Sequence, residues 1–312
     1  MIFEHTSVMP KEVLANLNLS MGKIVVDCTL GGSGHALQII KSIQPGGKLI
    51  GIDQDIDAIK NAEKVLSPFA ENFVLFHDNF SALPSILESV NIKGVDGVLL
   101  DLGLSLHQLR NGKRGFSFQK DEPLDMRMDT RNSRTAADIV NSFSERKLAD
   151  IFFRYGEERM SRRIARQIVT ARQTKPLKTS RELACIVQKA VPAKIAHAMK
   201  IHPATRVFQA LRITVNRELE KLETFMDAVP DILNPHGRLC VISFHSLEDR
   251  IVKQKIRSFE NGCTCPRDFP ECICGFKQSL KSISKKPFRP TKQEIMSNPM
   301  ARSASLRVAE RL

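Results

Sequence analysis

A glycine-rich turn between two acidic residues is the part of this chain best suited to chemistry. Asp27 ends a short apolar run, and the turn 31–34 (Gly-Gly-Ser-Gly) follows closely. Asp53 ends the next apolar run, 19 positions after Gly34. Glycines let backbone N–H groups approach a ligand, and an acidic residue at this spacing can accept hydrogen bonds from both hydroxyls of a ribose. The pattern predicts a site for a nucleotide-like ligand.

The turn departs from the dinucleotide fingerprint at two positions. Leu37 stands where that fingerprint needs its third glycine, and the charge of Asp27 would oppose a pyrophosphate. Asp27 instead suits a ligand with an ammonium group. S-adenosylmethionine (AdoMet) has a ribose, an adenine and an amino acid, and it has no phosphate. The turn therefore favours AdoMet over a dinucleotide, and a turn whose glycines serve only packing is the third interpretation.

Predicted strands would position these residues. Four apolar runs predict buried strands, at residues 24–26, 48–52, 73–76 and 95–100. Asp101 follows the fourth strand and would point into the ligand crevice, with a helix cap as its structural alternative. Phe80 follows the third strand, where it could stack on an adenine or simply belong to the core.

The alternation of strands and helices stops at about residue 110 and returns later. Helical patterns take its place, at residues 136–140, 145–155, 157–172, 180–191 and 203–228. A turn at 234–237 and a strand at 238–244 follow, and Ser246 is the expected N-cap of the next helix. Residues 280–285 and 303–310 alternate as a closing pair of strands would. We predict an α/β domain from residues 1–110 and 215–312, interrupted by an all-helical domain at 111–214.

Positive charge is concentrated in the predicted insertion. The chain carries a net charge of +13, of which residues 1–110 contribute −4, residues 111–220 +11 and residues 221–312 +6. A basic region beside a small-molecule site favours a polyanionic substrate. In the helical pattern 157–172, four arginines lie off the apolar stripe: Arg159, Arg162, Arg163 and Arg166. We expect this face to bind the polyanion, and a merely solvated basic face is the alternative.

Composition excludes several classes of protein. The hydrophobic content of 42% is ordinary for a globular protein. No run of about 18 apolar residues predicts a transmembrane helix, and the N-terminus lacks the apolar core of a secretory signal. We therefore expect a cytoplasmic protein without a membrane partner.

Four cysteines form two Cys-x-Cys pairs, at Cys263, Cys265, Cys272 and Cys274. Four thiolates on two short loops could hold zinc tetrahedrally, although the gap within each pair is tighter than the usual two residues. A cluster of reduced thiols without a metal is the equal alternative, since a reducing compartment disfavours disulfides.

Long motifs run in order through most of the chain. They are GGSGH, LLDLG, RGFSF, PLDMRMD, YGEER, HPATRVFQALRI, SFHSLEDRIVK and NPMARSASLRVAER, at residues 31–35, 99–103, 114–118, 123–129, 155–159, 202–213, 243–253 and 298–311. With these motifs the chain resembles the 16S rRNA cytidine N4-methyltransferases, the family of ribosomal RNA small subunit methyltransferase H. The resemblance covers essentially the whole chain.

The resemblance implies a class I (Rossmann-like) methyltransferase fold with a mostly parallel sheet and an inserted all-helical domain. It implies AdoMet contacts at Ser33, Gly34, His35, Asp53, Phe80, Asp101 and Gln108, of which Gln108 comes from the resemblance alone. The implied substrate is 16S rRNA within the 30S subunit, gripped through its backbone by the basic insertion. Zinc, where bound, would be structural.

Methyl transfer to the exocyclic amine of cytosine needs a group that accepts a hydrogen bond from that amine. Many amino-methyltransferases use a D-P-P-Y-like loop after the fourth strand, whereas this chain has Asp-Leu-Gly-Leu-Ser at 101–105. The candidate acceptors are Asp101, Ser105 and a backbone carbonyl. The runner-up function is a non-catalytic RNA-binding protein, which would bind RNA without AdoMet. The sequence leaves the oligomeric state open, a homodimer included.

Overall fold

A computed structural model describes residues 7–110, 113–199, 201–266 and 273–312. Contacts divide the chain into two compact units, one formed by Met1–Gly103 with Leu219–Leu312 and the other by Leu104–Glu218. Leu104 and Leu109, which the sequence placed in the α/β domain, pack against the core of the second unit. None of the described helices is long and apolar enough to cross a membrane.

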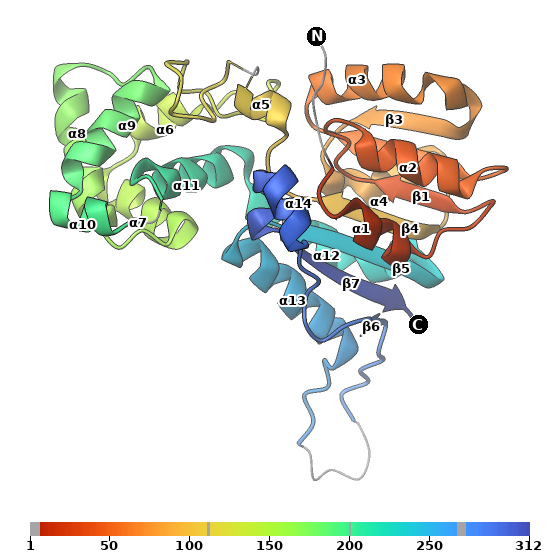
Figure 1. The fold of residues 1–312 in the computed structure, drawn as a ribbon. Helices are drawn as coiled ribbons and strands as arrows, with labels where there is room; N and C mark the ends of the chain where they lie inside the picture. Colours follow the sequence, from red (N-terminus) through yellow and green to blue (C-terminus); the bar gives the residue numbers. More distant parts are fainter. Residues whose placement is uncertain (1–6, 111–112, 200, 267–272) are drawn as a thin grey trace. The chain divides into compact units, whose positions relative to one another are not determined.

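The first unit is built on a seven-stranded sheet in the order β3-β2-β1-β4-β5-β7-β6 (Figure 1). Its strands are β1 (Ile24–Asp27), β2 (Lys48–Asp53), β3 (Phe73–His77), β4 (Val95–Asp101), β5 (Leu233–Ser243), β6 (Leu280–Ser282) and β7 (Ser305–Arg311). The strands from β3 to β5 run parallel, and β7 pairs antiparallel with both β5 and β6. The class I methyltransferase fold is therefore confirmed, with its closing antiparallel pair.

Helices cover both faces of this sheet. They are α1 (Pro10–Leu17), α2 (Gly34–Ile43), α3 (Ile56–Leu66), α4 (Leu83–Ser89), α12 (Glu218–Ile232), α13 (Ser246–Glu260) and α14 (Lys292–Ser297), with the short 3-10 turns η1 (Ser67–Asn72), η2 (Phe80–Ala82) and η3 (Pro299–Ser303). Val25 packs in the cluster that includes α1 and α2, whereas Val26 packs in the opposite cluster with α4 and α12. A strand buried on both faces explains the unbroken β-branched run of β1.

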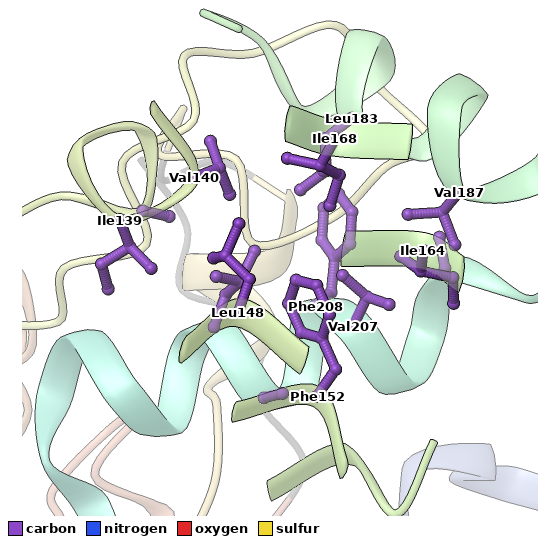
Figure 2. Close-up of a cluster of buried hydrophobic side chains, with 14 of the residues drawn as sticks. Ile139, Val140, Leu148, Phe152, Ile164, Ile168, Leu183, Val187, Val207 and Phe208 are labelled. Carbon is purple, nitrogen blue, oxygen red and sulfur yellow. The ribbon is translucent and has the colours of Figure 1, made fainter. Parts of the chain in front are cut away.

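The second unit is helical. Its helices are α5 (Leu106–Arg110), α6 (Ala136–Ser142), α7 (Glu145–Gly156), α8 (Ser161–Thr174), α9 (Ser180–Ala190), α10 (Ala193–Ala198) and α11 (Ala204–Asn216). Apart from an isolated bridge between Pro123 and Thr179, its described residues form no strand. Figure 2 shows how Leu148, Phe152 and Phe208 point into one apolar cluster between these helices.

Two predicted helices are interrupted by left-handed residues. The predicted helix 157–172 begins only at Ser161, because Glu157 (φ 49°) ends α7 and its N–H bonds to the Phe152 carbonyl. The predicted helix 203–228 is two helices, α11 and α12, which meet at Arg217 (φ 52°). Gly156, directly before Glu157, marks the end of α7 in the sequence, whereas no glycine or proline marks the break at Arg217.

One further prediction is confirmed in a different form, and another is wrong. The expected turn at 234–237 is an irregularity inside β5: that strand advances from Leu233 to Arg238 while β4 advances from Val95 to Gly97, and His236 (φ 64°) is left-handed. His245, not Ser246, is the N-cap of α13, and it forms a capping box with Glu248.

Candidate functional site

Three aspartates stand at the carboxyl ends of adjacent parallel strands. Asp27 ends β1, Asp53 ends β2 and Asp101 ends β4, and β1 lies between the other two strands. The connections leave β1 toward β2 on one side and reach β4 on the other, so this edge is the switch point of the sheet. Ligands of open α/β sheets bind at such a point.

The glycine-rich turn is held against β2 by Asp53. One carboxylate oxygen of Asp53 accepts from the Gly31 N–H at 2.9 Å, and the other accepts from the Asp55 N–H at 2.8 Å. Gly31 (φ 46°) and Ser33 (φ 66°) take left-handed backbone conformations. α2 then starts at Gly34, where a Cβ would collide with the Ser7 side chain. The turn thus keeps the amino end of α2 close to the strand ends.

Two acids make this edge unusual: Asp27 is fully buried, and the side chain of Asp101 is only 12% exposed. Burial, and secondarily the charge of Asp53, raise the pKa of Asp27 to about 8. Burial also raises the pKa of Asp101, with contributions from the charges of Asp27 and Glu248. Among the described residues, one oxygen of Asp27 and one of Asp101 have no hydrogen-bond partner. Such carboxyl oxygens suit a ligand that brings positive charge.

His35 completes this group from the first turn of α2. Its side chain is buried, and its Nε2 lies 3.8 Å from a carboxylate oxygen of Asp101. The Asp101 N–H donates to the Thr29 hydroxyl at 2.7 Å, which ties the end of β4 to the start of the glycine-rich turn. The structure therefore brings Ser33, Gly34, His35, Asp53 and Asp101 to one edge of the sheet.

Phe80 begins η2, just beyond β3. Its ring packs edge-on against Phe225 of α12, with ring centres 5.6 Å apart, and only 7% of Phe80 is exposed. This packing accounts for its burial, and an adenine contact stays a prediction. Gln54 was not a candidate from the sequence, and its side-chain oxygen accepts from the Asn79 amide at 3.1 Å. Gln54 directly follows β2 and Asn79 lies two positions after β3, and these positions at the carboxyl ends of parallel strands are the signal that could have found them.

Ser105 and Gln108 belong to the second unit. The Ser105 N–H donates to the Gln108 side-chain oxygen at 3.0 Å, and the Gln108 N–H donates to the Ser105 hydroxyl at 3.2 Å. This reciprocal pair caps the start of α5. Ser105 therefore has a structural role besides the one proposed from the sequence.

The arginines predicted on one helical face are exposed, but one of them lies close to an acidic residue of another helix. Arg162, Arg163 and Arg166 are exposed on α8, while Ile164 and Ile168 are buried, and Arg159 lies in the preceding turn. Glu145 of α7 lies 3.6 Å from Arg166 and so partly neutralises this face, a pairing that the sequence did not predict. Glu158 is buried and accepts from the Met160 N–H, which leaves it little able to neutralise this face.

Three of the four paired cysteines lie together. The sulfurs of Cys263, Cys265 and Cys274 are all within 4.8 Å of one another. Those of Cys263 and Cys274 are 3.7 Å apart, and the Ile273 N–H points to the Cys265 sulfur at 3.3 Å. Cys272 lies outside the described residues. Three thiols at such distances fit the donor set of a tetrahedral zinc site.

Comparisons with known proteins cover the whole chain. Residues 2–312 match the family model described as the MraW methylase family. The chain is 64% identical over 312 residues to ribosomal RNA small subunit methyltransferase H of Desulforapulum autotrophicum, with 100% of both chains covered. It is 54% identical to the protein of that name from Desulfosudis oleivorans, again with 100% of both covered.

Among solved structures, an rRNA methylase from Streptococcus thermophilus matches 97% of this chain and 95% of its own, with 12% identity and a TM-score of 0.39. The sequence matches carry the assignment. Because the family model and the relatives span essentially the entire sequence, the chain belongs to the MraW methylase family.

Proposed function

We propose that this chain is an AdoMet-dependent methyltransferase that methylates N4 of a cytidine in 16S rRNA. The observation that carries the proposal is the group of aspartates at the ends of β1, β2 and β4 in a chain of this family. Two of them, Asp27 and Asp101, bury a carboxyl oxygen without a partner among the described residues. A cofactor with an ammonium and a sulfonium group would supply the positive charge that these oxygens lack.

Each part of AdoMet has candidate residues. Asp53 would accept from the ribose hydroxyls, since both of its oxygens are already oriented by backbone N–H groups. Ser33, Gly34 and His35, at the amino end of α2, would hold the amino-acid part together with Asp27. Phe80 would contact the adenine. Gln108 is carried over from the family resemblance.

The bound cofactor supplies an electrophilic methyl group, and the protein must orient the amine that receives it. Asp101 is the candidate to accept a hydrogen bond from that amine. Its raised pKa also makes its carboxylate a stronger base for the proton that the methylated amine loses. Ser105 is the second candidate. The target base must leave its stack to reach these groups.

The basic second unit would bind the RNA backbone, with the 30S subunit as the form in which 16S rRNA is presented. This substrate would place the reaction in the cytoplasm. Zinc bound by Cys263, Cys265 and Cys274, with Cys272 as the fourth ligand from the sequence, would stabilise the loop that follows α13.

The test is transfer of labelled methyl groups from AdoMet to 16S rRNA, offered naked and within 30S subunits that lack the modification. We expect one methyl group per rRNA, located at N4 of a single cytidine. RNA binding without transfer to either substrate would favour the runner-up, a non-catalytic RNA-binding protein. Transfer to another atom would reject the assignment of the amine.

A further inference from the structure

A cavity of about 560 Å³ opens beside the carboxyl end of β5. Its lining residues all belong to the first unit and come from the end of β5, the first half of α13 and the segments on either side of α14. Its lining includes the cations Arg250, Lys253 and Arg289 and the hydroxyls of Ser246, Ser303 and Ser305. None of these residues belongs to the acidic group proposed to hold AdoMet.

Positive charge dominates this cavity. Asp249 is the acid in its lining, and the guanidinium of Arg307 donates to both oxygens of that carboxylate, at 2.7 and 2.9 Å. Burial of Asp249 opposes ionisation, but hydrogen bonds from Arg307 and Ser305 lower its pKa below the ordinary value. Asp249 is thus already paired. Lys253 has no anionic partner among the residues that the structure describes.

The cations are held on different elements. Arg250 and Lys253 project from the second and third turns of α13, three positions apart. Arg289 comes from the segment before α14, where one guanidinium nitrogen donates to the Ala304 carbonyl at 3.1 Å. That bond orients Arg289 while leaving most of its N–H donors available. Cations from two separate segments thus line one concave, positively charged cavity.

The cavity adjoins the loop that carries the candidate acceptor of the amine. Phe244 lines the cavity, and a Cβ placed on Gly103 would lie 3.3 Å from the Phe244 ring. Leu102, directly after Asp101, donates its N–H to the Ile242 carbonyl at 3.0 Å. A group bound in the cavity is therefore close to the end of β4.

We propose that this cavity binds a backbone phosphate of the substrate RNA, close in sequence to the nucleotide that is methylated. The inference rests on the proposed function and adds a contact in the first unit to the one expected on α8. Arginine, lysine and hydroxyl groups are the usual ligands of RNA phosphates. A phosphate fixed here would position the flipped nucleotide, whereas the arginines of α8 would add affinity for the RNA backbone.

The test compares two double variants in the full-length protein. Lys253→Gln with Arg289→Gln removes two cations of the cavity, and Lys60→Gln with Lys64→Gln removes two exposed lysines of α3 as the matched control. Binding of a labelled RNA hairpin that contains the target cytidine is measured over a range of salt, alongside AdoMet affinity, melting temperature and single-turnover methyl transfer.

We expect the cavity variant to lose about tenfold or more in RNA affinity and to flatten the salt dependence by roughly 0.7–0.9 per lost contact. AdoMet affinity should match that of the control. The charge-conserving variant, Lys253→Arg with Arg289→Lys, should recover most of the loss, which separates charge from misfolding.

Two results would overturn the inference. If wild-type protein transfers methyl groups but the cavity variant and the control bind RNA alike, the phosphate site is wrong while the proposed function stands. If millimolar inorganic phosphate raises the melting temperature of the wild type but not of the cavity variant, and the two proteins bind RNA equally tightly, the site takes a free anion and not RNA. Wild-type protein that methylates neither naked 16S rRNA nor unmodified 30S subunits would reject the proposed function itself.

Discussion

Among single residues, Asp27 most directly couples this fold to pH. Its pKa of about 8 in the folded protein stands far above the ordinary 3.8 of an aspartate, so the cofactor-free protein holds a proton there that the unfolded chain releases. Stability must then fall as pH rises through the window between these two values. The slope for one such proton reaches about 1.4 kcal/mol per pH unit.

Asp27→Asn tests this coupling, because asparagine cannot ionise. We expect the variant to gain stability relative to the wild type as pH rises from about 5 to about 9. Urea unfolding of the cofactor-free proteins measures the difference, and Glu63→Gln on the exposed face of α3 serves as the control. Parallel curves for Asp27→Asn and the wild type would mean that Asp27 is ionised in the folded protein across that range.

Asp53 is the residue on which the ribose assignment depends. Asp53→Ala removes a charged acceptor of hydrogen bonds worth roughly 1.5–3 kcal/mol each, and it also releases the N–H groups of Gly31 and Asp55. We expect AdoMet affinity to fall by about tenfold or more, with RNA affinity nearly unchanged. Calorimetric titration that finds AdoMet affinity intact would exclude Asp53 from the ribose site.

At the level of elements, α8 presents the densest positive charge of the second unit. Arg162→Gln with Arg166→Gln should weaken RNA binding and reduce its salt slope by roughly 0.7–0.9 per lost phosphate contact. The loss should come mainly from Arg162, since Glu145 already lies 3.6 Å from Arg166. Single variants measured by salt titration separate the two. An unchanged slope in the double variant would make this a solvated face.

The cysteines in the loop after α13 lead to the prediction that this loop binds zinc. Protein purified without chelators should contain about one zinc per chain, and Cys263→Ser with Cys274→Ser should lose it together with some thermal stability. Elemental analysis measures the zinc content of both proteins, and melting curves measure the loss of stability in the variant. If the purified protein has no zinc and the double variant melts normally, the cysteines are a cluster of reduced thiols.

Local sequence signals predicted strands and helices well where neighbouring residues alone determine the backbone conformation. The apolar runs before Asp27 and Asp53 predicted β1 and β2, and the glycines between them predicted the turn. The break at Arg217 escaped prediction, because no glycine or proline marks it, whereas Gly156 already separates the predicted helices 145–155 and 157–172, and only the start of the second of these, at Ser161, lies later than predicted. Secondary structure from sequence fails where tertiary contacts outweigh propensity.

The residues of the candidate site also fall into two groups, those that the local sequence predicts and those that only the packing of the fold brings together. Asp53 and Asp101 could be found because each directly ends an apolar strand. The pairing of Arg166 with Glu145 could not, since it depends on how α7 and α8 pack. The cavity cations Lys253 and Arg289 are 36 positions apart in the sequence, and only the fold brings them to one cavity.

For the whole molecule, the most consequential feature is that the two units have separate cores. The cluster of the second unit contains residues from Phe116 to Val215, and both clusters of the first unit lie on the faces of the sheet. Phe152 and Phe225 are fully buried, one in each unit. They are a matched pair of probes for how the units contribute to function.

Phe152→Ala should cost about 3–5 kcal/mol, as large-to-small changes of buried phenylalanine do, and the damage should stay in the second unit. We expect faster amide hydrogen exchange in α7, α8 and α11, weaker RNA binding and nearly normal AdoMet affinity. Phe225→Ala should do the reverse, because it removes the ring against which Phe80 packs. Hydrogen exchange on both variants shows which unit each substitution destabilises, and calorimetry measures the AdoMet affinity that remains. If Phe152→Ala impairs AdoMet binding as much as Phe225→Ala does, the two cores fold as one cooperative structure, and AdoMet binding depends on both.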